Sequence, residues 1–170
     1  MSLDAARRGD RASLDALLRE HLPAIRRTIA RCTGAGPEAD DAVQQTLMAV
    51  VRGISSFRGD APIGAWIHKI AVRQAWASAR TRANVIPFVE EADTRPASGE
   101  MRAEAAHAVA HLNRLSPERR VAFVLHDVEG FSAREIAETL DIPEGTVNSR
   151  LREARMQLRE ALGARARKVS

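Results

Sequence analysis

The sequence has few of the residues that build disulfide-linked, metal-binding or β-rich proteins. It contains one cysteine, Cys32, which excludes an internal disulfide and a zinc site made from several cysteines. Aromatic residues are also scarce, with four Phe, two Trp and no Tyr among 170 residues. Because strand-like alternation is nearly absent and Ala, Leu and Arg abound, we expect an all-α fold with an aliphatic core.

Long apolar runs are missing as well. No stretch is long enough to span a bilayer, and the N-terminal sequence MSLDAARRGD lacks the hydrophobic region of a signal peptide. We therefore expect a cytoplasmic protein that does not insert into a membrane. The net charge of +4 favours a polyanionic partner.

No catalytic or metal-binding motif is evident. The five histidines form no catalytic set, and His107 and His111 have the i, i+4 spacing of metal ligands without a further ligand motif. The sequence thus predicts no enzyme, no metal and no cofactor.

Two helices around a tight turn are predicted near the C-terminus. Ser132 and Glu135 have the spacing of a capping box at the start of the first helix. Asp141 and Ile142 then end that helix, and Pro143 suits the first position of the next one. In the second helix apolar residues recur at steps of four, three and four, which puts them on one inward face. They are Val147, Leu151, Ala154 and Leu158.

A polar stripe follows the same steps one residue later. Its members are Asn148, Arg152, Arg155 and Arg159. Arginine donates bidentately to guanine and asparagine to adenine, and both side chains hold phosphates. Residues 150–170 contain seven basic and two acidic residues, whereas residues 104–149 contain four Arg and eight acidic residues. A DNA-binding helix-turn-helix fits this pattern, and a merely solvated helix face is the alternative.

The first 80 residues predict further helices. The segment from Asp10 to Arg31 has helical spacing, with Pro23 expected to kink or divide it. Gly36 and Pro37 open a helix whose buried stripe is expected to face away from a polar patch. The stripe consists of Val43, Leu47, Val50, Val51 and Ile54, and the patch of Asp40, Asp41, Gln44 and Gln45. The patch is either a binding surface or simple N-terminal capping chemistry.

A helix from Pro62 to about Arg80 combines an apolar stripe with a cationic face. The stripe consists of Ile63, Trp66, Ile67 and Ile70, and the cationic face of Lys69, Arg73, Trp76 and Arg80. Cations that follow phosphates and an indole that stacks on a base suit single-stranded DNA. Alternatively, Trp76 fills a gap against the preceding helices.

Residues 81–103 read as a flexible linker, because they contain two Pro and one Gly and show no sustained period. The fold expected is therefore two small helical domains, residues 1–80 and 104–170, the second containing the helix-turn-helix.

Three segments resemble bacterial sigma factors of the extracytoplasmic-function (ECF) class. LSPERRVAFVLHDVEGFSAREIAETLDIPEGTVNSRLREARMQLREAL looks like region 4 of that class. EADDAVQQTLMAVVRGISSFRG is similar to region 2.2, and FRGDAPIGAWIHKIAVRQAWASARTR to regions 2.3 and 2.4. The resemblance covers about nine-tenths of the chain; where it departs, Gln45, Gln74 and Ser78 replace the Glu, Asn and Asp that the family usually has.

The resemblance implies a sigma factor, monomeric when free, that binds core RNA polymerase at the clamp helices of its largest subunit and directs it to promoter DNA. An anti-sigma factor is the expected controlling partner. The implied minus-35 contacts are Thr146, Asn148, Ser149, Arg152, Arg155 and Arg159. The implied minus-10 contacts are Lys69, Arg73, Gln74, Trp76 and Arg80, and the polymerase contacts are Asp40, Asp41, Gln44 and Gln45. Alternatives are a stand-alone helix-turn-helix regulator that dimerises on an operator, and a sigma mimic that only makes interactions.

Overall fold

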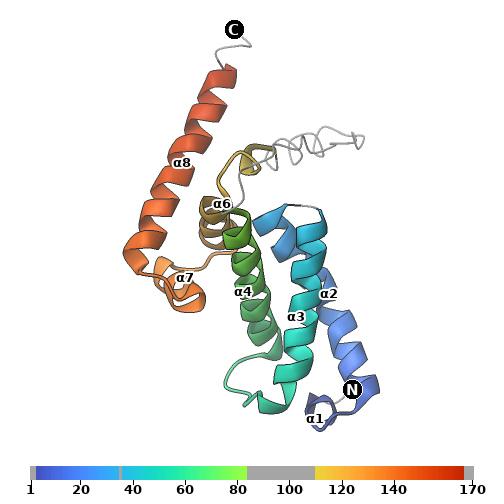
Figure 1. Ribbon diagram of the computed structural model, residues 1–170. Coiled ribbons are helices and arrows are strands. Elements are labelled where there is room, and N and C mark those ends of the chain that lie inside the picture. The colour runs from blue at the N-terminus through green and yellow to red at the C-terminus, as the bar shows by residue number, and fades with distance from the viewer. Residues whose placement is uncertain (1–2, 35, 84–109, 167–170) are drawn as a thin grey trace. The chain divides into compact units, whose positions relative to one another are not determined.

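The computed structural model describes residues 3–34, 36–83 and 110–166, and every regular element in these ranges is a helix (Figure 1). The chain divides into two compact units, residues 1–78 and 79–170. The predicted all-α fold with two helical domains is therefore confirmed. The exact domain limits stay a prediction: the fourth helix, α4, continues to Ala83, three residues into the proposed linker, and the rest of that linker lies outside the described residues.

The first unit is built from three long helices and two short ones. These are α1 (Leu3–Arg7), α2 (Arg11–Thr33), α3 (Pro37–Gly53), η1 (Ile54–Ser56) and α4 (Ile63–Ala83). The helix α2 begins at an N-cap, Asp10, whose carboxylate accepts a hydrogen bond from the Ser13 amide at 2.8 Å. Hydrogen bonding from the Ser13 hydroxyl and from this amide lowers the pKa of Asp10. Pro23 is exposed and lies inside α2, which remains one element, so the sequence-based division into two helices does not occur.

The core of the first unit is aliphatic, as expected. Ile25, Ile29, Val50 and Ile67 are almost completely buried, and Cys32 is a packing residue with no exposed surface. A hydrogen-bond contact of 3.2 Å between the Thr28 hydroxyl and His68 joins α2 to α4.

Two residues of this unit, Val51 and Trp66, are less buried than the sequence predicts. Val51, predicted to be buried, is 45% exposed. Trp66 is only half-buried, and its ring lies 5.3 Å from that of Phe57. It also lies against Gly53, where an added Cβ would be 3.1 Å from the indole, so α3 and α4 approach closely because residue 53 has no side chain.

The second unit contains α6 (Pro117–Phe123), the π-helical turn η2 (Val124–Val128), α7 (Ala133–Leu140) and α8 (Glu144–Ala166). Both α6 and α7 pack against α8. The core side chains come from all four elements. They are Val121, Val124, Leu125, Ile136, Val147, Leu151 and Ala154, each at most 3% exposed.

The helix-turn-helix forms through the expected local chemistry. The Ser132 hydroxyl accepts from the Glu135 amide at 3.2 Å, and the Ser132 amide donates to the Glu135 carboxylate at 2.9 Å, so both bonds of the capping box are present. Asp141 ends α7 in the left-handed conformation, with φ of 54°. α8 begins at Glu144, one residue after the expected start, and the Pro143 carbonyl accepts from the Val147 amide.

Candidate nucleic-acid interface

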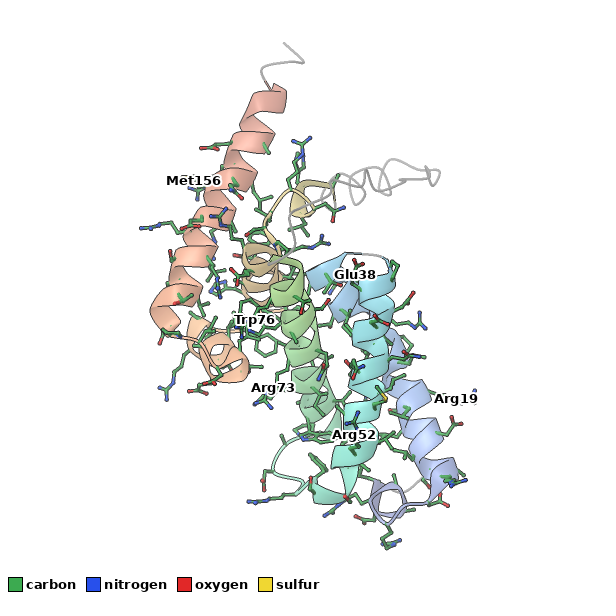
Figure 2. The ribbon with its side chains drawn as sticks, in the orientation of Figure 1. Arg19, Glu38, Arg52, Arg73, Trp76 and Met156 are labelled. Atoms are coloured by element: carbon green, nitrogen blue, oxygen red, sulfur yellow. The ribbon has the colours of Figure 1, made fainter. Side chains whose placement is uncertain are left out.

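The polar stripe of α8 divides into exposed and anchored residues. Asn148, Arg152 and Arg159 are exposed, and among the described residues neither arginine has a hydrogen bond or an ion pair. Met156, one turn beyond Arg152, is 53% exposed on the same helix and was not predicted (Figure 2). These side chains are therefore available to a ligand without prior rearrangement.

Arg155 differs from its neighbours in the stripe because it is held by η2. Its Nη2 and Nε donate to the two carboxylate oxygens of Asp127 at 2.8 and 3.3 Å. The same Nη2 lies 3.2 Å from Nδ1 of His126. A DNA phosphate would have to compete with Asp127 for this guanidinium, so an immediate DNA contact is less accessible to Arg155 than to Arg152.

The opposite flank of α8 is braced against α6 by two ion pairs. Arg150 lies 3.2 Å from Glu118, and Arg119 lies 2.6 Å from Glu153. The Ser149 hydroxyl donates to Glu153 at 3.4 Å. In each of the two ion pairs one partner belongs to α6 and the other to α8, so the pairs limit the rotation of α8 about its axis.

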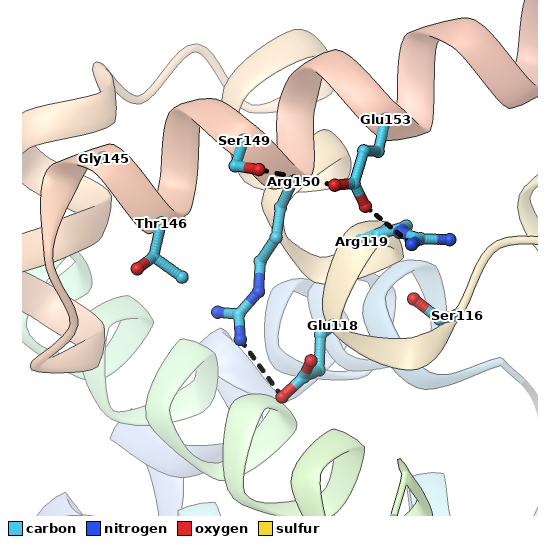
Figure 3. A pocket seen from close by; sticks show the side chains of 8 residues that line it. All are labelled: Ser116, Glu118, Arg119, Gly145, Thr146, Ser149, Arg150 and Glu153. Carbon is cyan, nitrogen blue, oxygen red and sulfur yellow. Dashed lines mark hydrogen bonds and ion pairs between the residues drawn. The ribbon is translucent and has the colours of Figure 1, made fainter.

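Between these two helices lies a hollow of about 410 Å³ (Figure 3). It is lined by Ser116, Glu118, Arg119, Gly145, Thr146, Ser149, Arg150 and Glu153. Thr146 and Ser149, two predicted minus-35 contacts, thus lie on the α6 side of the helix. The brace could not be predicted from the sequence, because nothing in the spacing of Glu118 and Arg119 reveals that α6 packs on the first turns of α8.

The cationic face of α4 is only partly as predicted. Lys69, Arg73 and Arg80 are exposed and Gln74 is half-buried. Trp76, labelled with Arg73 in Figure 2, is only 6% exposed and sits at the border of the buried side of α4, one turn after Val72. In this conformation the indole is a packing residue, and its stacking on a base stays a prediction that would require the ring to be released.

The polar patch of α3 is fully at the surface. Asp40, Asp41, Gln44 and Gln45 are exposed, and an ion pair joins Asp40 to Arg26 at 3.9 Å. Two apolar side chains extend the same side of the helix and were not predicted as part of it. They are Met48 and Val51, which are 41% and 45% exposed.

In the described ranges no group of three or more His, Cys, Asp or Glu side chains could hold a metal ion. The helices that the structure describes are all too short or too polar to cross a membrane. His107, one half of the possible metal pair, lies outside the described residues.

Comparison with known proteins decides the family. The domain description "Sigma-70 region 2" matches residues 17–85, and "Sigma-70, region 4" matches residues 110–158. The ECF RNA polymerase sigma factor SigM of Mycobacterium tuberculosis is 37% identical over 157 residues, which cover 91% of this chain and 80% of the relative. This chain belongs to the ECF class of RNA polymerase sigma factors. Sigma factors are transcription initiation factors, and the resemblance drawn from the sequence is confirmed.

Two solved structures resemble this ECF sigma factor. CnrH in complex with the cytosolic domain of CnrY has a TM-score of 0.61 and 25% identity, covering 95% of both chains. The sigma factor RpoE of Bartonella quintana, crystallised with the anti-sigma factor NepR, has a TM-score of 0.62 and 26% identity, covering 89% of this chain and 97% of that one. The α3 patch and the cationic face of α4 fall within the region 2 match, and the region 4 match covers α7 and the part of α8 up to Leu158.

Proposed function

We propose that this sigma factor reads the minus-35 promoter element by placing α8 in the major groove. The observation that carries the proposal is the contrast along α8, where Asn148 and Arg152 are exposed while Arg150 and Arg155 are held by α6 and η2. The paired arginines fix the helix, and the residues near its N-terminal half contact base edges. Thr146, Ser149 and Arg159 are proposed as further contacts to the same duplex.

The second part of the proposal concerns core RNA polymerase. Its clamp helices would dock on the α3 patch of Asp40, Asp41, Gln44 and Gln45. The exposed Met48 and Val51 support this, because protein interfaces combine apolar anchors with a polar rim. Gln45 makes this surface less acidic than in most of the family, so a larger share of the affinity would come from its apolar part.

The third part concerns the minus-10 element. Lys69, Arg73 and Arg80 would follow the phosphates of the opened strand, with Gln74 beside them. These contacts would supply salt-dependent affinity and little base preference. Trp76 would join them only if polymerase binding rotates it out of the core.

The neighbouring structures support control by an anti-sigma factor, since RpoE was solved with the anti-sigma factor NepR, and CnrH with the cytosolic domain of CnrY. We propose the same kind of control here, with residues 81–103 as a linker that lets the two domains close around the inhibitor. The free protein would be a monomer, would carry out no catalysis of its own, and would act in the cytoplasm, where polymerase works.

Run-off transcription with purified core polymerase on a promoter library tests the proposal directly. Promoter-dependent transcripts are expected, and their shared upstream sequence gives the minus-35 preference. A homodimer that binds a palindrome tightly without polymerase would instead support a stand-alone regulator. Binding to core without any transcript would support a sigma mimic.

A further inference from the structure

The hollow between α6 and the first turns of α8 carries an inference that rests on the proposed DNA-binding role of α8. We propose that it holds one backbone phosphate of duplex DNA. Arg119 would be the charged donor, and Glu153 the carboxylate that Arg119 exchanges for the phosphate. Arg119 belongs to α6, whereas the predicted minus-35 contacts all belong to α8.

The position of the hollow is suited to a phosphate. The major groove is about 12 Å wide and a helix with its side chains is about 10 to 12 Å across, so each flank of an inserted helix faces a phosphate backbone. The hollow lies on the flank of the first two turns of α8, since Gly145, Thr146 and Ser149 line it. The N-terminal residues of a recognition helix are the ones that contact base edges in the major groove.

Its donors are suited to a phosphate as well. Arg119 supplies a guanidinium, and hydroxyl groups of Ser116 and Thr146 line the same space (Figure 3). Neither hydroxyl has a hydrogen bond among the described residues, and that of Ser116 makes no capping bond at the start of α6. Two hydroxyl donors and one planar cation can surround a tetrahedral anion.

The pairing of Arg119 with Glu153 is suited to exchange. Their side chains are 32% and 36% exposed, and partly solvated pairs of this kind stabilise a fold only weakly. Arg150 is different, because its side chain is only 17% exposed in its pair with Glu118. The two ion pairs of the brace therefore differ: Arg150 with Glu118 is the more buried pair, and Arg119 belongs to the pair that can exchange its carboxylate for a phosphate. Before DNA binds, Glu153 keeps that cation in place and compensates its charge.

Salt-dependent binding of the full-length protein to a labelled random-sequence duplex, followed by fluorescence anisotropy between 50 and 200 mM NaCl, tests the site. One phosphate contact contributes about 0.9 to the slope of log affinity against log salt. Arg119→Gln should lower the slope by about that amount, so its loss of affinity should be about threefold larger at 50 mM than at 200 mM NaCl. Glu153→Gln should tighten binding, because it removes the carboxylate that competes with the phosphate.

Arg114→Gln is the matched control. Arg114 is an exposed arginine of the same domain that lines a separate hollow with Gln157, Leu158 and Ala161, about three turns farther along α8. Arg114→Gln removes one positive charge, as Arg119→Gln does, but at a position away from the proposed contact. It should therefore change the salt slope by less than half as much as Arg119→Gln. Equal effects of Arg114→Gln and Arg119→Gln would overturn the proposal.

Two further outcomes separate a phosphate contact from a purely structural brace. Arg119→Lys keeps the charge and should retain most of the salt slope. If Arg119→Lys lowers the slope as much as Arg119→Gln does, with an unchanged melting temperature, the site is contradicted. A weakening by Glu153→Gln equal to that of Arg119→Gln also contradicts it. Run-off transcription tests the proposed function separately. If the wild-type protein gives no transcript, the proposed function is wrong, and the salt slopes of duplex binding still decide whether this site exists.

Discussion

The two candidate surfaces of this sigma factor differ in how their charges are compensated. The α3 patch carries carboxylates and amides with, in the described part of the chain, one long ion pair of 3.9 Å, and it is continued by two exposed apolar side chains. Around α8, in contrast, three arginines lie 2.6 to 3.2 Å from carboxylates. The first surface is suited to a protein partner, and the second keeps most of its cations engaged until a polyanion competes for them.

This difference shows why a basic helix face cannot be taken as a set of equivalent contacts. Arg152 and Arg155 lie on one stripe and are the same residue type. Only their neighbours on other helices distinguish them, since Asp127 holds Arg155 while Arg152 faces solvent. The following predictions test that contrast, beginning with the change of largest expected effect.

The largest effect is expected from Leu151→Ala in the core under α8. Leu151 is 3% exposed, and truncating a buried leucine costs about 2 to 5 kcal/mol of unfolding free energy.

Both tryptophans, Trp66 and Trp76, lie in the first unit, so tryptophan fluorescence follows that unit alone. In urea, the circular dichroism transition of the second unit should shift while the fluorescence transition stays. Ile29→Ala in the first unit should do the reverse, and one shared transition for both probes would contradict two separate bodies.

A double change on the α3 patch, Asp41→Ala with Gln44→Ala, should weaken binding to core polymerase. Loss of two polar contacts costs about 2 to 4 kcal/mol, which is roughly a 30- to 1,000-fold loss of affinity. Competition binding with labelled core measures it. Asp15→Ala, which removes an exposed carboxylate of α2 paired with Arg19, is the control and should leave the affinity unchanged. An equal loss of duplex binding by the double variant would argue against a separate polymerase surface.

We expect Arg152→Ala to affect mainly the recognition of DNA, and Arg155→Ala to affect mainly the stability of the fold. Arg152→Ala is expected to reduce discrimination between a minus-35 site and its scrambled version by about 1 to 3 kcal/mol, with an unchanged melting temperature. Arg155→Ala is expected to lower stability by up to about 1 kcal/mol, because Asp127 loses its partner, and to change discrimination less. Holoenzyme binding to the two duplexes and thermal melting of each variant measure both quantities. The opposite order would show that Asp127 releases Arg155 to DNA.

The smallest effect is expected at the start of the helix-turn-helix. Ser132→Ala removes the side-chain half of the capping box and should cost the second unit about 1 kcal/mol. Polymerase binding by the first unit should not change. Ser55→Ala, an exposed serine of η1 in the first unit, is the control and should leave both unfolding transitions in place.

Much of the fold could be predicted because its signals are local. The capping box of Ser132 and Glu135 and the apolar steps of α8 act within one or two helical turns, so spacing alone reveals them. The position of Trp76 could not be predicted in the same way. It lies on the border between two faces of α4, and only packing against other segments decides whether such a ring is covered.

The candidate surfaces were predicted as regions and less well as individual residues. Helical spacing correctly placed Asp41 and Gln44 on the surface, but it placed Val51 in the core. Val51 has the same spacing as the buried apolar residues of α3, and the sequence alone does not show that its side chain is exposed. The ion pairs of Glu118, Arg119 and Asp127 depend on contacts across some 28 to 34 residues of chain. No helical period spans such a separation.

The π-helical turn η2 determines where the anchor of Arg155 points. In it the Glu129 amide donates to the Val124 carbonyl at 3.0 Å, five residues back, where an α-helix would bond four back. Each residue added to or removed from a helix rotates everything after it by about 100°. A homologue lacking one residue between Val124 and Val128 would therefore turn its acidic side chain away from α8. In such a protein the arginine at this position would be freed without any change in the recognition helix itself, so a length change in one helix would alter the charge that another presents to DNA.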